Sequence, residues 1–264
     1  MATASSGETC AHNHSVGVAN AAGLVSGFVD SVAGGGGLIT VPALLLVGLD
    51  PKAALATNKF QASFGSSMAT WQYYRHGHIE IRPAVPGVAV TFIAAVCGTL
   101  TVRAISPDIL GKIVPIAMGV ILVYTIISPK LGHVARKPLL GRYGFYAIFG
   151  LLLGFYDGFF GPGTGSFWTM AFMIFMGYEM PRATGHTKLM NFTSNIASLL
   201  FFLPSGLIRY SHGMVMAAGQ LIGARIGARM ASRRGTKFIR PVFLAVVAVV
   251  TVQLIWKYFF ASAT

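Results

Sequence analysis

Residues 23–30 read Gly-Leu-Val-Ser-Gly-Phe-Val-Asp, and residues 150–157 read Gly-Leu-Leu-Leu-Gly-Phe-Tyr-Asp. Each octapeptide is followed by a glycine cluster, at residues 34–37 in the first case and at residues 161–165 in the second. Further matches follow in the same order, such as Ala-Thr-Asn-Lys at 56–59 with Gly-His-Thr-Lys at 185–188. Because the offset between matching positions is nearly constant, the chain is one unit that has been duplicated.

The composition lacks the polar surface that water demands. Of the 264 residues, 54% are hydrophobic and 10% are charged, whereas soluble domains carry about 25% charged residues. Apolar runs recur at 84–102, 113–127, 189–207 and 242–256, and at ~1.5 Å of rise per residue several approach the ~30 Å of a hydrocarbon core. Because a backbone in lipid must satisfy its own hydrogen bonds, we predict an all-α integral membrane protein.

Each repeat is predicted to contain five helical segments. A polar tail at 1–15 precedes the first repeat at 16–128, with segments at 16–32, 38–49, 54–75, 83–102 and 108–128. A basic cytoplasmic linker at 129–142 leads to the second repeat at 143–260, with segments at 143–159, 165–178, 183–204, 213–231 and 237–260. The second segment of each repeat is too short to cross comfortably, so it forms a helical hairpin with the first, either crossing twice or re-entrant. Both arrangements give an odd number of crossings, which predicts inverted repeats.

The basic residues indicate how the chain is oriented. The net charge is +13, but the lysines and arginines lie in short loops between apolar runs, which favours membrane orientation over nucleic-acid binding. The larger share falls on the side of the linker, so we expect that side in the cytoplasm and both termini outside. Cys10 and Cys97 form no disulfide framework, and the sequence contains no zinc or nucleotide-binding motif. Neither a metal nor another cofactor is therefore expected.

Two carboxylates fall inside apolar segments. The chain has seven acidic residues, and Asp30 and Asp157 lie at equivalent positions just before the glycine turns. A carboxylate at membrane depth costs roughly 2.5–3.5 kcal/mol, so each needs a partner or a task. Either the carboxylate caps the turn by accepting backbone N–H bonds, or it couples to protons or substrate, and the two roles are compatible. Paired catalytic carboxylates are disfavoured, because each lies at a glycine turn rather than along a helix.

The glycine turns and two lysines are candidates for anion binding. Each turn precedes a short helix whose free N–H groups and positive dipole end would face it, as at the broken helices of transporters; a packing turn is the alternative. Lys59 and Lys188 occupy equivalent positions, each followed on one helical face by small or polar residues. Snorkelling to the membrane interface is the alternative for the lysines. The expected substrate contacts are Gly35, Gly36, Gly37, Asn58, Lys59, Gly163, Thr164, Gly165, Ser166, Thr187, Lys188, Asn191 and Asn195, with Asp30 and Asp157 as coupling residues.

Three stretches carry a resemblance to a known family. Residues 34–44 read Gly-Gly-Gly-Gly-Leu-Ile-Thr-Val-Pro-Ala-Leu, residues 54–59 read Ala-Leu-Ala-Thr-Asn-Lys, and residues 157–168 read Asp-Gly-Phe-Phe-Gly-Pro-Gly-Thr-Gly-Ser-Phe-Trp. With these the chain resembles the sulfite exporter TauE/SafE family over residues 16–260, and within it the widespread, poorly assigned branch. The resemblance implies a multi-pass transporter of the bacterial inner membrane, and the distribution of basic residues then predicts periplasmic termini. It places the hairpin residues, Lys59 and Lys188 at the central site and favours export.

The sequence therefore predicts a secondary transporter and not an enzyme. The expected substrate is a small anion, namely sulfite, a sulfonate or another organosulfur anion, bound between the two repeats within the lipid bilayer. Asp30 and Asp157 would tune this site or couple it to protons. The alternatives are a passive anion channel and a non-transporting membrane scaffold or enzyme. The sequence leaves the oligomeric state open, a homodimer included.

Overall fold

The chain folds into packed helices. The computed structural model describes residues 20–32, 34–106, 108–110, 112, 116 and 137–234. A first helix covers residues 20–32, followed by α2 (Gly37–Leu46), α3 (Pro51–Arg75), α4 (Ile81–Ala104), α6 (Arg142–Phe159), α7 (Thr164–Phe175), α8 (Met180–Phe202), a 3₁₀ turn (Leu203–Ser205) and α9 (Tyr210–Arg234). The all-helical prediction is confirmed, with no strand among the described residues. The predicted tail at 1–15, the helix at 237–260 and most of the segments at 108–128 and 129–142 lie outside them.

Capping residues and glycine turns set the helix boundaries. The Oδ1 of Asp50 accepts hydrogen bonds from the N–H groups of Lys52 and Ala53 at 3.0 and 3.1 Å, and so caps α3. Gly34 and Gly163 have φ angles of 77° and 82° just before α2 and α7, a left-handed conformation that favours glycine. The two helices that follow contain 10 and 12 residues. At ~1.5 Å per residue, neither can span ~30 Å of hydrocarbon on its own.

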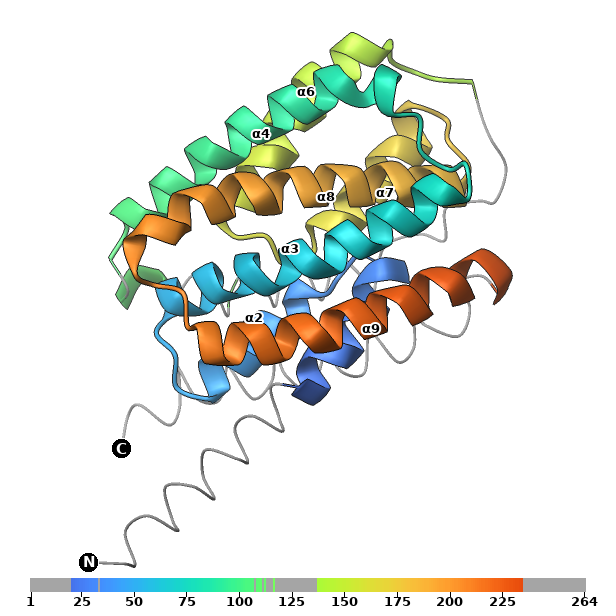
Figure 1. Cartoon of the computed structure of the whole chain (residues 1–264). Coiled ribbons are helices and arrows are strands. Elements are labelled where there is room, and N and C mark those ends of the chain that lie inside the picture. The colour runs from blue at the N-terminus through green and yellow to red at the C-terminus, as the bar shows by residue number, and fades with distance from the viewer. Residues whose placement is uncertain are drawn as a thin grey trace, which may run out of the picture.

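Helices α3 and α8 lie side by side in the middle of the molecule and run in opposite directions (Figure 1). At one end, Lys52 Nζ donates to the carbonyl of Arg103 at 2.7 Å, and Arg103 Nη1 donates to the carbonyl of Phe201 at 3.0 Å. The start of α3, the end of α4 and the end of α8 therefore meet. At the other end, a Cβ on Gly185 would lie 3.0 Å from the carbonyl oxygen of His78. The start of α8 thus meets the loop after α3.

Glycines let two pairs of helices cross at close range. A Cβ on Gly27 would lie 2.6 Å from the carbonyl oxygen of Gln220, so helix 20–32 packs directly on the backbone of α9. A Cβ on Gly158 would overlap the backbone of Ala95, so α6 packs in the same way on α4. Other glycines extend the two crossings, namely Gly23, Gly219, Gly223 and Gly227 in the first and Gly98 and Gly154 in the second. In both crossings, a helix from one half of the chain packs on a helix from the other half.

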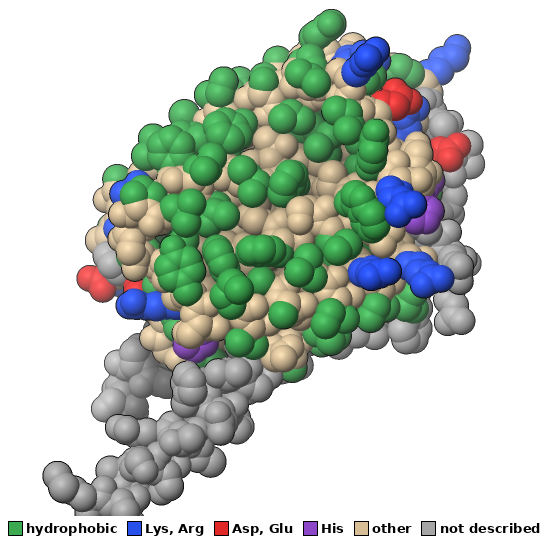
Figure 2. All heavy atoms as spheres, viewed as in Figure 1, with side chains coloured by type: hydrophobic (Ala, Val, Ile, Leu, Met, Phe, Trp, Pro, Cys, Tyr) green, Lys and Arg blue, Asp and Glu red, His purple; other side chains and the backbone are tan. Residues whose placement is uncertain are grey.

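The outer surface is apolar around its middle. Figure 2 shows hydrophobic side chains across the middle of one face, with charged side chains gathered at its two ends. Large apolar side chains such as Val85, Ile93 and Leu152 are 55–63% exposed. Within the described residues, α4 is the one helix both long and apolar enough on average to cross a membrane, while α2 and α7 are apolar but shorter. Helices α3 and α8 instead carry their polar residues inward.

Candidate functional site

A small polar cavity lies where the two glycine turns meet the polar faces of α3 and α8. Its volume is about 30 Å³, enough for about two water molecules. Of the residues singled out from the sequence, it is lined by Asp30, Gly36, Gly37, Asn58, Lys59, Asp157, Gly163, Gly165, Asn191 and Asn195. Residues from both halves of the chain therefore share one cavity.

The two glycine turns touch each other beside this cavity. A Cβ on Gly165 would lie 2.5 Å from the Cα and the carbonyl oxygen of Gly34, so neither position accepts a side chain without movement of the backbone. Gly37 also faces the backbone of Pro162, which a Cβ would approach to 3.1 Å. The starts of α2 and α7 are thus brought together by contacts that glycine alone permits.

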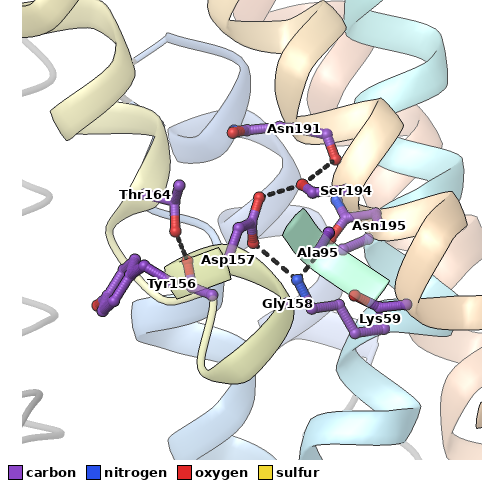
Figure 3. A network of polar contacts seen from close by, with 12 residues as sticks. Lys59, Ala95, Tyr156, Asp157, Gly158, Thr164, Asn191, Ser194 and Asn195 are labelled. Carbon is purple, nitrogen blue, oxygen red and sulfur yellow. Dashed lines mark hydrogen bonds and ion pairs between the residues drawn. The ribbon is translucent and has the colours of Figure 1, made fainter. Parts of the chain in front are cut away.

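Lys59 on α3 forms an ion pair with Asp157 on α6 (Figure 3). The distance from Lys59 Nζ to Asp157 Oδ1 is 2.7 Å, and the two side chains are 2% and 5% exposed. Lys59 Nζ also donates to Asn195 Oδ1 at 3.2 Å, and Ser194 Oγ donates to Asp157 Oδ2. Both charges are therefore compensated within a hydrogen-bonded network, as a buried ion pair requires.

Lys188 on α8 forms the matching ion pair with Asp30. The distance from Lys188 Nζ to Asp30 Oδ2 is 3.0 Å, and the side chains are 0% and 20% exposed. Asp30 Oδ1 accepts a hydrogen bond from the backbone N–H of Gly36 at 3.1 Å. Asp30 therefore caps its glycine turn and pairs with a cation at once, while the bonds observed at Asp157 come from side chains.

The two ion pairs are reciprocal between the halves of the chain. Lys59 lies in the first half and reaches a carboxylate of the second, whereas Lys188 lies in the second half and reaches a carboxylate of the first. Both lysines are buried in the third turn of their helices, so the snorkelling alternative is excluded. The positive charge expected at the site is present, but each lysine amine already forms an ion pair with a carboxylate.

Amide side chains complete the wall of the cavity. Asn58 Oδ1 accepts hydrogen bonds from Thr40 Oγ1 and from Gln61 Nε2. Asn191 Oδ1 is buried and finds no hydrogen-bond partner among the described residues. An unpaired buried acceptor costs free energy, which makes this oxygen available to a water molecule or to a ligand.

Some of the residues singled out from the sequence lie behind the cavity wall. Gly35, Thr164, Ser166, Thr187 and Lys188 are not among the residues that line it. Thr164 Oγ1 donates to the carbonyl of Gly161 at 2.6 Å, which stabilises the turn, and Thr187 bonds to Thr169 at 3.0 Å. Lys188 acts on the cavity through Asp30, which does line it.

Sequence reasoning missed Gln220 as a site residue. This glutamine on α9 lines the cavity, is 2% exposed, and donates through Nε2 to Ser26 Oγ. The available signal was an uncharged but strongly polar side chain in the otherwise apolar, glycine-rich stretch 213–224 of α9, which is costly in lipid unless it faces inward.

Comparisons with known proteins identify the family of the chain. The family model described as "Sulfite exporter TauE/SafE" matches residues 19–254. The chain is 42% identical over 233 residues to "Probable membrane transporter protein YfcA" of Escherichia coli strain K12, which covers 88% of this chain and 87% of that protein. It is 41% identical over 238 residues to a "Probable membrane transporter protein" of Haemophilus influenzae, covering 89% and 92%. These matches cover most of this chain and most of each relative. Together with the apolar exterior of the helical core, they indicate that the protein lies in a membrane. The chain belongs to the TauE/SafE sulfite exporter family of membrane transporters.

Proposed function

We propose that the protein is a secondary transporter that moves a small anion, namely sulfite, a sulfonate or another organosulfur anion, through a site between two inverted repeats. The observation that carries this proposal is the pair of reciprocal, buried lysine–aspartate contacts beside a shared cavity. Ionisable residues inside membrane segments are rare, and by default they indicate a substrate or ion pathway. Here two such pairs converge from equivalent positions.

The directions of the helices support an inverted relation between the halves. Helices α3 and α8 carry the equivalent lysines and run antiparallel at the centre. The crossing of helix 20–32 with α9 mirrors that of α6 with α4. Inverted repeats with broken helices around a central site are a common design of secondary transporters. The anion would bind where the N-termini of α2 and α7 come together.

The distribution of charge supports a cytoplasmic location for one end of the molecule. Arginines gather where α3 and α9 end and where α4, α6 and α8 begin, namely Arg75, Arg82, Arg142, Arg182 and Arg229. The opposite end holds Lys52, Arg103 and Arg209. By the positive-inside rule, the arginine-rich end faces the cytoplasm, and the protein lies in the bacterial inner membrane with both termini of the chain in the periplasm.

The size of the cavity requires a conformational change during transport. About 30 Å³ holds about two water molecules, so we infer that the two halves separate at the glycine turns to admit a larger anion such as a sulfonate. Such a change exposes the site to one side of the membrane at a time. A carrier of this kind saturates with substrate, whereas a channel conducts in proportion to the gradient.

Flux measurements in reconstituted vesicles test this proposal. Purified protein should take up sulfite or methanesulfonate with saturable kinetics, and Lys59→Gln or Lys188→Gln should each abolish uptake because each removes a buried cation. Lys52→Gln is the matched control, since Lys52 lies at a helix end and contacts a backbone carbonyl, and it should retain uptake. Full flux in the Lys59→Gln/Lys188→Gln double variant would remove both lysines from the site. Flux that never saturates, with single-channel currents, would show a channel instead.

A further inference from the structure

The two ion pairs occupy equivalent positions but differ in their surroundings. The Asp157 side chain is 5% exposed, whereas that of Asp30 is 20% exposed. Lys59 donates to two side chains, Asp157 and Asn195, whereas Asp30 is the one hydrogen-bond partner of the Lys188 amine within the described part of the chain. A lysine ammonium carries three N–H donors. Lys188 therefore retains more unused donor capacity than Lys59, and its carboxylate partner is the more accessible one.

We propose that Asp30 binds the coupling proton and that Lys188, once released from it, binds the transported anion, while Lys59 and Asp157 remain paired as a structural anchor. This inference rests on the proposed function and assigns separate roles to its two ion pairs. The proton adds to Asp30 Oδ2, the atom that Lys188 now contacts. A neutral carboxyl no longer holds the ammonium electrostatically, so the amine, which is 0% exposed and now lies behind Asp30, can move past it to the cavity and the anion.

The groups that surround Asp30 allow this exchange. Helix α8 supplies Lys188, α3 supplies Lys59 and Tyr73, and α6 supplies Asp157. The Tyr73 hydroxyl donates to the carbonyl of Ser31 at 3.1 Å, so it is a neutral neighbour. Among the described residues that line the cavity, neither α2 nor α9 supplies a charged side chain. Lys188 is therefore the cation that Asp30 neutralises directly.

Charge balance explains why proton and anion would move together. With Asp30 ionised and no anion, the Asp30–Lys188 pair is neutral; with Asp30 protonated and one anion on Lys188, the site is neutral again. Binding of the proton alone leaves one positive charge, and binding of the anion alone leaves one negative charge. An uncompensated charge in a low-dielectric interior is strongly unfavourable. The two neutral states are thus the ones that can pass through a closed, water-poor conformation.

Methanesulfonate in proteoliposomes tests this assignment, because its charge does not change over the pH range used. One proton per monovalent anion is electroneutral, so an inward gradient of one pH unit should drive about a tenfold accumulation in the native protein. In Asp30→Asn, accumulation should fall to a ratio of about one, while methanesulfonate exchange across the membrane continues, since a neutral side chain already leaves Lys188 free. In Asp157→Asn, accumulation and exchange should either both persist or both fall. Glu80→Gln, which removes a carboxylate from an exposed ion pair, is the control and should accumulate normally.

A second variant covers the case in which Asp30→Asn does not fold. Asp30→Glu keeps the carboxyl group but moves it, so accumulation should persist with a shifted pH profile, whereas Asp157→Glu should leave the profile where it is. Undiminished accumulation in Asp30→Asn, or a shifted profile in Asp157→Glu and not in Asp30→Glu, overturns the assignment while the transport function stands. Absence of both uptake and exchange of methanesulfonate and sulfite in the native protein would overturn the transport function itself.

Discussion

At the scale of single residues, the dominant feature is charge buried away from water. Lys59 and Asp157 are both nearly inaccessible, and each compensates the other within a network that includes Ser194 and Asn195. Removing one member of such a pair leaves the other as an isolated charge. Solvent cannot relieve that charge, because the site has room for only about two water molecules.

We expect Asp157→Asn to lower the free energy of unfolding by about 3–5 kcal/mol, the usual cost of breaking a buried ion pair. Thermal unfolding in detergent would show this as a lower melting temperature. Glu80→Gln breaks the exposed pair with Arg182 and should cost no more than about 1 kcal/mol. Replacing both partners, as in Lys59→Met/Asp157→Leu, should restore much of the loss. A double variant as unstable as Asp157→Asn would contradict the role of the unpaired charge.

The sequence identified the four charged residues but not their pairing. Asp30 and Asp157 stand out as carboxylates in apolar segments, and Lys59 and Lys188 stand out because they occupy equivalent positions in the two repeats. Their partners are 98 and 158 residues apart in the chain, and duplication alone allows pairing within a half as well as between halves. Tertiary packing decides between these, so the reciprocal arrangement could not be predicted from the repeat.

At the scale of helices, close crossings depend on the absence of side chains. Gly158 faces the backbone of Ala95, and Gly27 faces that of Gln220. Helices in lipid gain little from burying apolar surface against each other, so their association relies on close van der Waals contact. A single methyl group at such a crossing must push two helices apart.

Two glycines of α6 provide a matched test of this point. Gly158→Ala should destabilise the protein by about 1–3 kcal/mol through overpacking against α4. Gly144→Ala, where a Cβ would meet nothing within 4 Å, should be neutral or stabilise by up to about 1 kcal/mol through helix propensity. Melting temperatures of the two variants, compared with the native protein, would check the difference. Equal effects of the two substitutions would argue against close packing at the crossing.

The helices themselves were predictable from the sequence to within a few residues. The segments at 54–75, 83–102 and 143–159 correspond to α3, α4 and α6, whose observed starts lie one to three residues earlier. The earlier start of α3 has a clear cause, because Asp50 caps its first turn. Apolar length and glycine turns carry this information. The neighbour of each helix could not be predicted from the sequence, because the close packing of Gly219, Gly223 and Gly227 on helix 20–32 depends on contacts between the two halves of the chain.

At the scale of the whole molecule, the proposed inversion fixes which ends lie on the same side of the membrane. The loop at 76–80 lies beside the start of α8, whereas the start of α9 lies near Thr57 in the first turns of α3. Inversion was predicted from the odd number of membrane crossings in each repeat. The relative placement of the two halves could not be predicted from the sequence, because it depends on contacts between helices that are far apart in the chain.

Cysteine labelling would test the orientation. In a protein with Cys10 and Cys97 replaced by serine, His76→Cys should react with a membrane-impermeant maleimide only from the cytoplasmic side. Ser211→Cys should react only from the periplasmic side; both positions are exposed at helix ends. Intact cells and inverted vesicles supply the two directions of access. Reaction of both cysteines from one side would contradict the proposed topology.

Each half of the chain holds the countercharges of the other half, and this pairing has a consequence for membrane insertion. When the first half enters the bilayer during synthesis, Asp30 and Lys59 precede their partners at positions 188 and 157 in the chain. Each uncompensated charge costs a few kcal/mol at membrane depth, so each half supplies the countercharges that stabilise the other half in lipid. The native ion pairs can therefore form only after the second half has entered the bilayer.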